Sequence, residues 1–437
     1  MPSQPSRSLV IAAGLRTPWA RAGGAFAGED AGHLAARVMR ELIARSGLDP
    51  AALDEVIVGC VGPSHDQANV ARVAALRAGV PANVPSRTVG RNCASGIEAV
   101  TTAVTEILAG VGDTYLCTGV EVMSAYPLLQ SRGMTKLFSN LMTAKSVGAK
   151  LSALATFRPS FLTPRVALLE GLRDPISGLL MGETAEVVAR DFGITREQAD
   201  AYAARSHHRA RDARDSGRLA QEILPVLGLG AHPKASALEH DDGIRDEQSP
   251  QALAKLRPYF EKPDGIVTVG NACGITDGAC ALLITTEEKA RALGLKPLAR
   301  LRSWAWAGLD PARMGLGPVY AASRALADAG CSLADMGVVE INEAFAAQVL
   351  GCEAAFGSDR FAREQLNLPR ALGELDMSRT NPNGGAIALG HPLGATGSRL
   401  LLTTALELAH GDHELGLASL CIGGGQGGAV VLERVAA

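Results

Sequence analysis

The sequence predicts an α/β protein made of two related halves. Short apolar runs alternate with segments of helical spacing in the first and the last third of the chain, a pattern typical of sheets that helices cover on both faces. One order of elements, a glycine-rich loop, a helix, a Gly-Asp turn and a strand, occurs at residues 89–119 and again at residues 395–421. A chain of 437 residues also exceeds one ordinary core, so we expect two or three domains.

The individual elements follow from local patterns. A short apolar run closed by a turn residue predicts a strand, and apolar residues at every third or fourth position predict a helix. In the first half these patterns place strands at residues 8–14, 55–60 and 114–119 and helices at residues 31–46, 67–77 and 97–108. In the second half they place strands at residues 297–306, 338–341 and 415–420 and helices at residues 318–329 and 398–408.

The middle of the chain fits neither half. Helices are predicted from Met181 and after Thr195, where Gln198 in the first turn is typical of a capped helix start. A strand at residues 280–285 returns the chain to the first half. We therefore expect an N-terminal half at residues 1–122 that residues 268–290 complete, a mostly helical loop domain at residues 123–267, and a C-terminal half at residues 291–437.

Residues 131–175 form an insertion in this loop domain. Lys and Arg recur in it at positions 136, 145, 150, 158, 165 and 173, with Leu, Phe and Val between them. A solvated helical insertion explains the individual charges. The alternative is an amphipathic docking surface for a partner or a membrane interface.

Composition excludes several classes of protein. The net charge of −3 gives no basic excess, so we expect no binding to nucleic acid. No apolar run reaches the roughly eighteen residues of a transmembrane helix, and residues 1–8 lack the apolar core of a secretory signal. The eight cysteines contain no C-x-x-C pair and no zinc-type cluster, so we expect reduced cysteines, a cytoplasmic location and no metal site.

One cysteine stands apart from the others. Cys93 lies in the sequence Val89-Gly-Arg-Asn-Cys-Ala-Ser-Gly96, where a loop meets a predicted helix start. The unpaired N–H groups and the dipole of a helix N-terminus favour an anion, so we expect a lowered pKa and a nucleophilic thiolate. The alternative is an inert cysteine buried at a helix cap.

Two more reactive side chains lie among glycines near the C-terminus. His391 follows Asn381-Pro-Asn-Gly-Gly and precedes Pro392-Leu-Gly-Ala-Thr-Gly397, and Cys421 begins Cys-Ile-Gly-Gly-Gly-Gln-Gly-Gly428. Glycine lets a backbone approach a ligand closely, which favours a pocket over two loops with a chance His and Cys. If the halves face each other, Cys93, His391 and Cys421 meet in one cleft.

These residue types suit acyl transfer. A thiolate attacks acyl groups, an imidazole takes its proton, and a second cysteine with thiolate character, here Cys421, can move a proton on the carbon next to a carbonyl. Asn342 follows the strand at residues 338–341, where α/β sheets place ligand contacts; together with His391, and through a water, it can steady an enolate oxygen. The N–H groups of Cys93 and Gly423 supply a second oxyanion hole. Together they predict acyl transfer with cleavage or formation of a carbon–carbon bond.

Four blocks of the sequence resemble the signature blocks of the thiolases. They are Val89-Gly-Arg-Asn-Cys-Ala-Ser-Gly96, Asn342-Glu-Ala-Phe-Ala346, Gly390-His-Pro-Leu-Gly-Ala-Thr-Gly397 and Cys421-Ile-Gly-Gly-Gly-Gln-Gly427. The resemblance implies a five-layered αβαβα fold with a loop domain between the halves. It also implies a homodimer or homotetramer that binds no permanent cofactor and uses coenzyme A (CoA) as its co-substrate.

The resemblance also implies a role for each residue. Cys93 is the acylated nucleophile, His391 the base that activates it, and Cys421 the acid and base at carbon two of the substrate. Met181 and Phe345 match positions that line the channel for the pantetheine arm of CoA. Cys273 stands where many thiolases have a serine that contacts CoA.

Other features point to a subgroup. The long segment before Met181, and residues 358–363, resemble the β-subunits of fatty-acid oxidation complexes, which implies an α-type hydratase/dehydrogenase partner. Leu180 replaces a histidine frequent in short-chain enzymes, whereas Asn342 is the usual thiolase residue where those β-subunits tend to have histidine. The sequence mixes features of two subgroups.

The sequence therefore predicts a 3-ketoacyl-CoA thiolase of fatty-acid β-oxidation, which cleaves 3-oxoacyl-CoA to acetyl-CoA and a shortened acyl-CoA through a Cys93 acyl-enzyme. The first alternative is a short-chain acetyl-CoA acetyltransferase that runs the condensation. The second is a non-catalytic scaffold subunit, which would have no need of all three reactive side chains. A decarboxylating ketoacyl synthase is disfavoured because it would use two histidines beside one cysteine.

Overall fold

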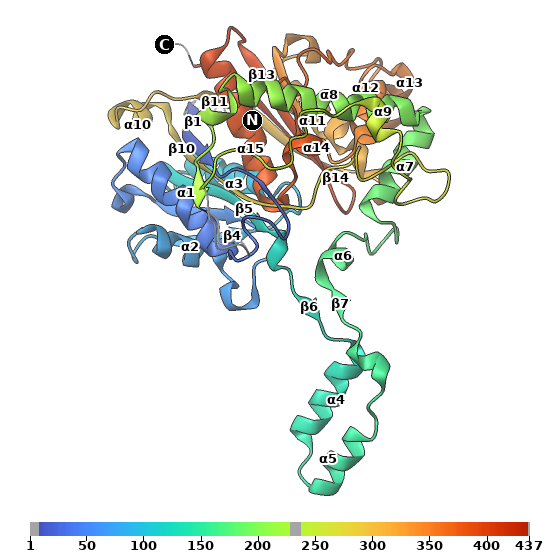
Figure 1. Ribbon diagram of the computed structural model, residues 1–437. Coiled ribbons are helices and arrows are strands. Elements are labelled where there is room, and N and C mark those ends of the chain that lie inside the picture. Colours follow the sequence, from blue (N-terminus) through green and yellow to red (C-terminus); the bar gives the residue numbers. More distant parts are fainter. Residues whose placement is uncertain (1–7, 228–236, 436–437) are drawn as a thin grey trace.

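The computed structural model describes residues 8–227 and 237–435. Residues 1–7, for which the sequence predicts a polar start without a secretory signal, lie outside the described residues, as do residues 228–236 of the expected loop domain. Figure 1 shows a body with mixed strands and helices and a long helical projection at one end.

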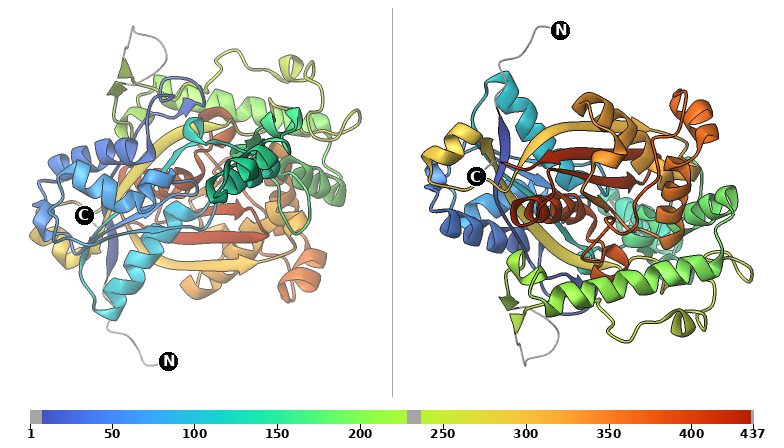
Figure 2. Two further views of the ribbon diagram at one scale, coloured as in Figure 1. Left: turned by 90° about the horizontal axis from the view of Figure 1, so that it is seen from below. Right: turned by 90° about the horizontal axis from the view of Figure 1, so that it is seen from above.

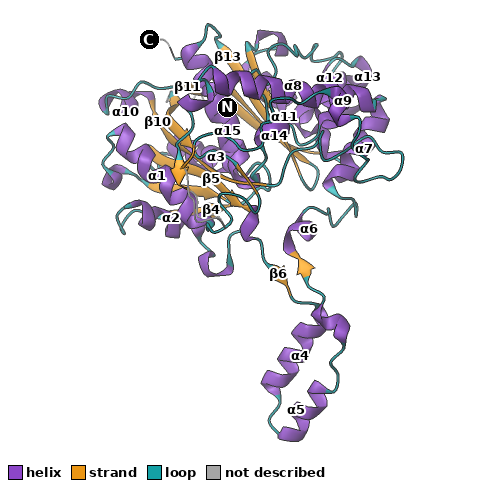
Figure 3. Ribbon diagram, viewed as in Figure 1, coloured by secondary structure: helices purple, strands orange, loops and turns teal. Residues whose placement is uncertain are grey.

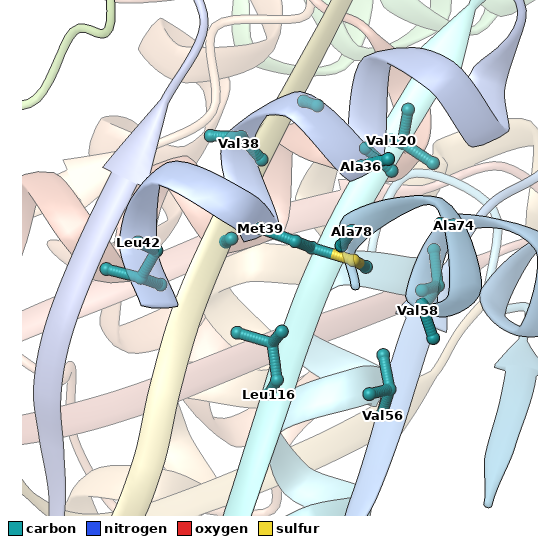
Figure 4. Packing of buried hydrophobic residues seen from close by; sticks show 14 of the residues in the cluster. Ala36, Val38, Met39, Leu42, Val56, Val58, Ala74, Ala78, Leu116 and Val120 are labelled. Carbon is teal, nitrogen blue, oxygen red and sulfur yellow. The ribbon is translucent and has the colours of Figure 1, made fainter. Parts of the chain in front are cut away.

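The central strands of the first half, β3 Glu55–Gly59, β5 Thr114–Val122 and β10 Thr276–Thr286, are buried on both faces, as their apolar runs predict. In β3, Val56 and Val58 face the two outer helices, whereas Ile57 faces the opposite side. Figure 4 shows the outer packing. Alternate side chains of a strand point to opposite faces, so such a strand needs a helix layer on each side. The strands are β1 Leu9–Arg16, β2 Ala20–Arg21, β3 Glu55–Gly59, β4 Ser86–Val89, β5 Thr114–Val122 and β10 Thr276–Thr286, and the helices are α1 Ala31–Ser46, α2 Val70–Ala78, α3 Ser95–Ala109 and α10 Glu287–Ala292.

The second half repeats this plan. Its strands are β11 Ala299–Gly308, β12 Val338–Ile341, β13 Leu415–Ile422 and β14 Gln426–Glu433. Its helices are α11 Gly317–Ala329, α12 Ala346–Phe356, α13 Asp359–Phe361, α14 Ala386–Leu389 and α15 Leu393–His410.

Strand order shows that the halves are related. The ten-stranded sheet runs β12-β13-β14-β11-β1-β10-β5-β3-β4, with β2 on β10. Outward from the junction of β1 and β11, the first half reads β1-β10-β5-β3 and the second β11-β14-β13-β12, which is the same order of corresponding strands. Helices α1 and α2 cover the first half, α11 covers the second, and α3 and α15 lie between them (Figure 3). The predicted five-layered α/β fold with two related halves is confirmed.

The central helices approach each other at glycines. A Cβ atom on Gly96 of α3 would lie 2.5 Å from the backbone nitrogen of Ser398, and one on Gly397 of α15 would lie 2.7 Å from the backbone nitrogen of Ile97. The sequence predicts a loop here and a helix from Ser398, and this is wrong, because α15 begins at Leu393. These glycines allow close packing of a helix rather than a loop.

The loop domain lies over the second half. Its helices are α7 Met181–Phe192, α8 Arg196–Asp215 and α9 Pro250–Leu253, and its strands are β8 Val226–Leu227 and β9 Ala237–Leu238. The Thr195 hydroxyl oxygen accepts a hydrogen bond from the Gln198 backbone N–H, and the Gln198 side-chain oxygen accepts one from the Thr195 backbone N–H, so the predicted cap is present. The predicted domain limits stay predictions, although β10 lies within the sheet of the first half.

A projection leaves the body from this region. We call residues 128–166 the arm. Strands β6 Leu128–Leu129 and β7 Arg165–Val166 pair at its base, and helices α4 Arg132–Thr143 and α5 Val147–Leu154 form its far end, with α6 Ala167–Gly171 after it (Figure 1). In the view from below, the arm lies in front of the body (Figure 2). None of the helices in the described ranges has the length and apolar character needed to span a membrane.

Candidate active site

Cys93 lies in a turn between β4 and α3 whose shape is fixed locally. Asn92 has a φ of 44°, in the left-handed region that asparagine tolerates better than most residues. The hydroxyl of Ser95 accepts a hydrogen bond from the Arg91 N–H at 2.9 Å and donates one to the Asn92 carbonyl at 2.7 Å. These bonds hold the turn in place. Helix α3 begins at Ser95, and Cys93 lies on the turn before it.

The turn joins the two halves. The Asn92 side-chain amide donates to the Gly423 carbonyl at 2.8 Å, and the Gly423 N–H donates to the Cys93 sulfur. Gly423 follows β13 of the second half, and Gly424 and Gly425 after it have φ of 92° and 76°. The left-handed turn therefore presents the Gly423 amide to the sulfur of the other half. The oxyanion hole of the Cys93 and Gly423 N–H groups stays a prediction.

The expected lowering of the Cys93 pKa is wrong for the free protein. Burial raises the pKa of the Cys93 thiol to about 11, although the N–H groups of Gly423 and Cys93 act in the opposite direction. Removal of water costs a thiolate more than two backbone donors return. Cys93 is therefore a neutral thiol at pH 7 and needs a base to become a nucleophile.

His391 has the properties of that base. Its Nδ1 lies 2.6 Å from the Thr396 hydroxyl, which donates to the Pro392 carbonyl at 3.0 Å. Because the hydroxyl hydrogen is engaged there, Nδ1 carries the ring proton and Nε2 keeps its lone pair. Burial, and then the positive charge of Arg399, lower the pKa of His391 to about 3, so the ring is neutral and able to accept a proton.

Asn342 lies next to this lone pair. Its side-chain nitrogen is 3.4 Å from His391 Nε2, and its Oδ1 is buried without a hydrogen-bond partner among the described residues. The neighbouring Glu343 fixes the segment, because its carboxylate accepts hydrogen bonds from Tyr202 at 2.9 Å and Ser206 at 2.6 Å, both on α8. An unpartnered buried oxygen is a place for a water or a substrate atom.

Cys421 lies at the end of β13 in a small apolar cluster. The cluster contains Met181, Phe345 and Phe260, and the rings of Phe260 and Phe345 meet edge to face at 6.1 Å. Burial, then the nearby Cys93, hold the pKa of the Cys421 thiol well above its usual range. Cys421 is therefore protonated, which suits a proton donor and corrects the expectation of thiolate character.

The expected substrate-binding residues surround the same place. The sulfur of Met181 lies 3.3 Å from where a Cβ on Gly423 would lie. The Cys273 N–H donates to the Ala344 carbonyl at 3.0 Å, which holds its loop against Phe345. Burial, then the charge of Cys93, raise the pKa of the Cys273 thiol to about 12. The structure thus brings Cys93, Cys273 and Cys421 close enough to influence one another.

Sequence reasoning missed one residue of this site. Glu121, fully buried near the end of β5, accepts backbone N–H bonds from Val61, Gly62 and Gly394, each at 3.0 Å. It also accepts a bond from the Tyr126 hydroxyl. Glu121 ties the loop of His391 to the first half. The sequence did offer one signal for this residue, because Glu121 is the single carboxylate in the predominantly apolar strand β5.

Family models match almost the whole chain. Residues 9–288 match the thiolase N-terminal domain and residues 295–434 the thiolase C-terminal domain. The chain is 38% identical over 426 residues to a 3-ketoacyl-CoA thiolase of Pectobacterium atrosepticum, covering 97% of this chain and 96% of the relative. It is 42% identical over 433 residues to a β-ketoadipyl-CoA thiolase of Escherichia coli, covering 98% of this chain and 100% of the relative.

Solved structures agree with this match. Human mitochondrial 3-ketoacyl-CoA thiolase in complex with CoA superposes with a TM-score of 0.83 at 34% identity, covering 98% of each chain. Bacillus anthracis acetyl-CoA acetyltransferase superposes with a TM-score of 0.85 at 36% identity, covering 99% of this chain and 100% of the other. Fold, sequence blocks and comparisons agree: the chain belongs to the thiolase family of acyltransferases.

Proposed function

We propose that this chain is a 3-ketoacyl-CoA thiolase that acts in fatty-acid β-oxidation. The observation that carries the proposal is the meeting of the two halves at Cys93, where the Gly423 amide of one half donates to the thiol of the other. The second half also holds a neutral imidazole, whose unprotonated Nε2 lies 3.4 Å from the side-chain nitrogen of Asn342. The nucleophile comes from the first half, and the base and the Gly423 N–H come from the second, so the two halves together supply these groups.

In the first half-reaction His391 Nε2 takes the proton of Cys93, and the thiolate attacks carbon three of the 3-oxoacyl-CoA. The N–H groups of Cys93 and Gly423 hold the resulting oxyanion. The bond between carbons two and three then breaks, and the acyl chain stays on Cys93. The leaving enolate, steadied at its oxygen by His391 and by Asn342 through a water, takes the Cys421 proton at carbon two, and acetyl-CoA departs.

The second half-reaction regenerates the enzyme. The imidazolium of His391 returns its proton to the Cys421 thiolate, so the site is neutral again. His391 then deprotonates free CoA, whose thiolate attacks the Cys93 thioester. The shortened acyl-CoA leaves, and Cys93 recovers its proton from His391. CoA is thus a co-substrate, in agreement with the CoA complex of the human relative.

The cluster around Cys421 is apolar, which suits both uncharged parts of a 3-oxoacyl-CoA, the pantetheine arm and the acyl chain. Met181, Phe345 and Phe260 surround Cys421, and Leu180 stands directly before Met181. An ionised tail, as in β-ketoadipyl-CoA, loses hydration in such surroundings unless a cation meets it. The short-chain acetyltransferase and the β-ketoadipyl-CoA thiolase are therefore the alternatives to test.

Assembly and location are further parts of the proposal. We expect a homodimer or homotetramer in the cytoplasm, with an α-type hydratase/dehydrogenase subunit as a further partner. At one end of the sheet, β4 pairs with no described strand other than β3, and such an edge offers backbone groups to a second chain. Sedimentation velocity of the purified protein, alone and with a candidate α-subunit, tests this part.

The test of activity measures thiolysis of three substrates, 3-oxohexadecanoyl-CoA, acetoacetyl-CoA and β-ketoadipyl-CoA, with free CoA present. We expect the highest kcat/KM for the long-chain substrate, with acetyl-CoA and tetradecanoyl-CoA as products, and no turnover by Cys93→Ala. Preference for acetoacetyl-CoA would support the short-chain acetyltransferase. Preference for β-ketoadipyl-CoA would support the activity for which the Escherichia coli relative is named. Absence of turnover with all three, in folded protein, would support a scaffold subunit.

A further inference from the structure

The arm concentrates exposed apolar side chains. Of the sixteen large hydrophobic residues exposed in the described part of the chain, eight lie in the arm, which contains 39 of the 437 residues. Exposed apolar residues scattered singly need no explanation, but a contiguous group marks an interaction site. The eight are Leu128, Phe138, Met142, Val147, Leu151, Leu154, Phe157 and Leu162.

The most exposed of these residues lie at the tip. Met142 in the last turn of α4 is 87% exposed, and Val147 at the start of α5 is 75% exposed. Val147, Leu151 and Leu154 recur at intervals of four and three residues, so they share one face of α5. Lys150 flanks this stripe and Lys145 lies in the turn between the helices. The tip is therefore amphipathic and faces away from the body (Figure 1).

The arm is internally ordered despite this exposure. Leu137 on α4 and Ala153 on α5 are buried, and the Ser131 hydroxyl donates to the Phe161 carbonyl at 2.7 Å. The rings of Phe157 and Phe161 meet edge to face at 6.2 Å. The arm thus has a small core of its own, and the exposed stripe is the side that this core leaves unused.

Charge in the arm is one-sided. Residues 122–169 contain no Asp or Glu and six basic residues, whereas the rest of the chain has 36 basic and 45 acidic residues, a net charge of −9. Of the six, Arg165 pairs with Glu170, and none of the other five has an ion pair among the described residues. The five are Arg132, Lys136, Lys145, Lys150 and Arg158.

We propose that the arm docks on the surface of a phospholipid bilayer that contains anionic lipid. Helices with an apolar stripe and flanking lysines bury the stripe at the boundary of headgroups and acyl chains, while the lysine ammonium groups stay with the anionic headgroups. Met142, Val147 and Leu151 enter the bilayer surface, and Lys145 and Lys150 contact headgroups. The acidic body is held away from the membrane by the length of the arm.

The shape of the arm favours a bilayer over a protein. Its apolar side chains lie on a narrow projecting hairpin, whereas the centre of a protein interface is a packed, lysine-poor patch with a complementary partner surface. A bilayer needs no such complementarity. Docking of two arms on each other would also bring their unpaired positive charges together. A second copy of this chain, or a different protein, is therefore an alternative outcome of the test.

The test is co-sedimentation of the full chain with vesicles of phosphatidylcholine alone and of phosphatidylcholine mixed with phosphatidylglycerol. At low salt we expect about tenfold or stronger partition into the anionic vesicles, because each engaged lysine adds electrostatic attraction. Raising the salt to about 0.5 M should remove most of this difference. Cys93→Ala should bind as the wild type does, which separates this result from failure of the proposed function.

Matched variants locate the binding surface. The triple variant Met142→Ser, Val147→Ser, Leu151→Ser should lose binding to both vesicle types, and Lys145→Gln with Lys150→Gln should lose the preference for anionic lipid. Val111→Ser with Ile176→Ser changes two residues that are 64% and 82% exposed outside the arm, and it should bind as the wild type does. Unchanged thermal melting and thiolysis would show that each variant is folded.

Three results would overturn the proposal. They are absence of wild-type binding to anionic vesicles, equal binding by the triple variant, and equal loss of binding in the control variant. Dissociation of a homo-oligomer by the triple variant, measured by sedimentation velocity, would instead assign the arm to a second copy. Loss of an α-subunit complex without any vesicle binding would assign it to that partner.

Discussion

The two halves use one local motif for two different purposes. The first copy of the motif is Cys93-Ala-Ser-Gly96, whose last two residues begin α3. The second copy is Gly394-Ala-Thr-Gly397, which lies in the first turns of α15. The glycines at the ends of the two motifs pack against the opposite helix at the centre of the molecule, so the motifs face each other.

The hydroxyl at the third position shows the difference. In both halves it donates to a carbonyl three or four residues earlier, that of Asn92 or of Pro392. In the first half its oxygen also accepts the Arg91 N–H, and this bond shapes a turn that presents a thiol. In the second half the oxygen meets Nδ1 of His391 and orients a base. The two halves thus share a scaffold, and different side chains at its ends divide the chemistry between them.

The largest expected effect comes from removing the nucleophile of the first half. Cys93→Ala removes the nucleophile, and we expect thiolysis to fall by about 10⁴-fold or more, since nothing else at the same position can hold the acyl group. Steady-state thiolysis and the loss of the acyl-enzyme mass check this. Residual activity within tenfold of the wild type would contradict the assignment.

Cys421→Ala removes the proton donor of the second half and affects only one of two reactions. Without its proton donor the enolate leaves poorly, so we expect thiolysis to fall by about 10³-fold. Exchange of labelled CoA into a saturated acyl-CoA needs only Cys93 and His391, and we expect it to stay within about tenfold of the wild type. Equal loss of both reactions would show that Cys421 does not act at carbon two.

The paired hydroxyls give the sharpest comparison. Thr396→Val removes the partner of His391 Nδ1, and we expect kcat to fall by about 10- to 100-fold with little change in KM. Ser95→Ala removes a turn bond and should mainly lower the free energy of unfolding, by about 1 kcal/mol. Kinetics and chemical denaturation of both variants distinguish the two roles. Equal kinetic effects would mean that both hydroxyls only support the turns.

The depressed pKa of His391 predicts a pH dependence of stability. Its pKa is about 3 in the folded protein, against an ordinary value of 6.5. Below pH 6.5 the unfolded chain binds a proton that the folded site refuses, so stability present above pH 6.5 is lost toward pH 3. The slope from this group is about 1.4 kcal/mol per pH unit.

Denaturant titrations from pH 7 to pH 4 measure this slope, with His391→Asn as the variant that lacks the titrating ring. We expect a shallower loss of stability in the variant. The same slope in both proteins would contradict the depressed pKa.

The smallest effect concerns Gly423, whose N–H rather than its missing side chain serves the site. A Cβ there would lie 3.3 Å from the Met181 sulfur, at the end of a flexible side chain. We therefore expect Gly423→Ala to retain kcat within about threefold, because the neighbour shifts easily. By contrast, Gly397→Ala would place its Cβ 2.7 Å from a backbone nitrogen and should destabilise the fold.

Patterns in the sequence predicted the elements that depend on local periodicity. The helix at residues 31–46 and the strand at residues 338–341 have the predicted limits. The start of α15 was missed because glycine read as a loop residue, whereas here it permits contact with a helix far away in the sequence. Such contacts leave no local signal.

The residues of the candidate site were visible in the sequence, but their electrostatics were not. The position of Cys93 before a helix predicted a lowered pKa, and burial raised it instead. Glu121 was missed because its partners, including the Gly394 N–H, come from loops distant in sequence. For residues 131–175 the sequence predicted a solvated helical insertion, with an amphipathic docking surface as the alternative, because the spacing of charged and apolar residues is a local pattern.

The most direct test of the account is to map the acyl group after brief mixing with 3-oxohexadecanoyl-CoA in the absence of free CoA. The protein is quenched in acid and digested, and the modified peptide is identified by mass spectrometry. We expect a tetradecanoyl group on Cys93, with Cys273 and Cys421 unmodified. An acyl group on Cys273 or Cys421 in the wild-type protein, with Cys93 free, would contradict it.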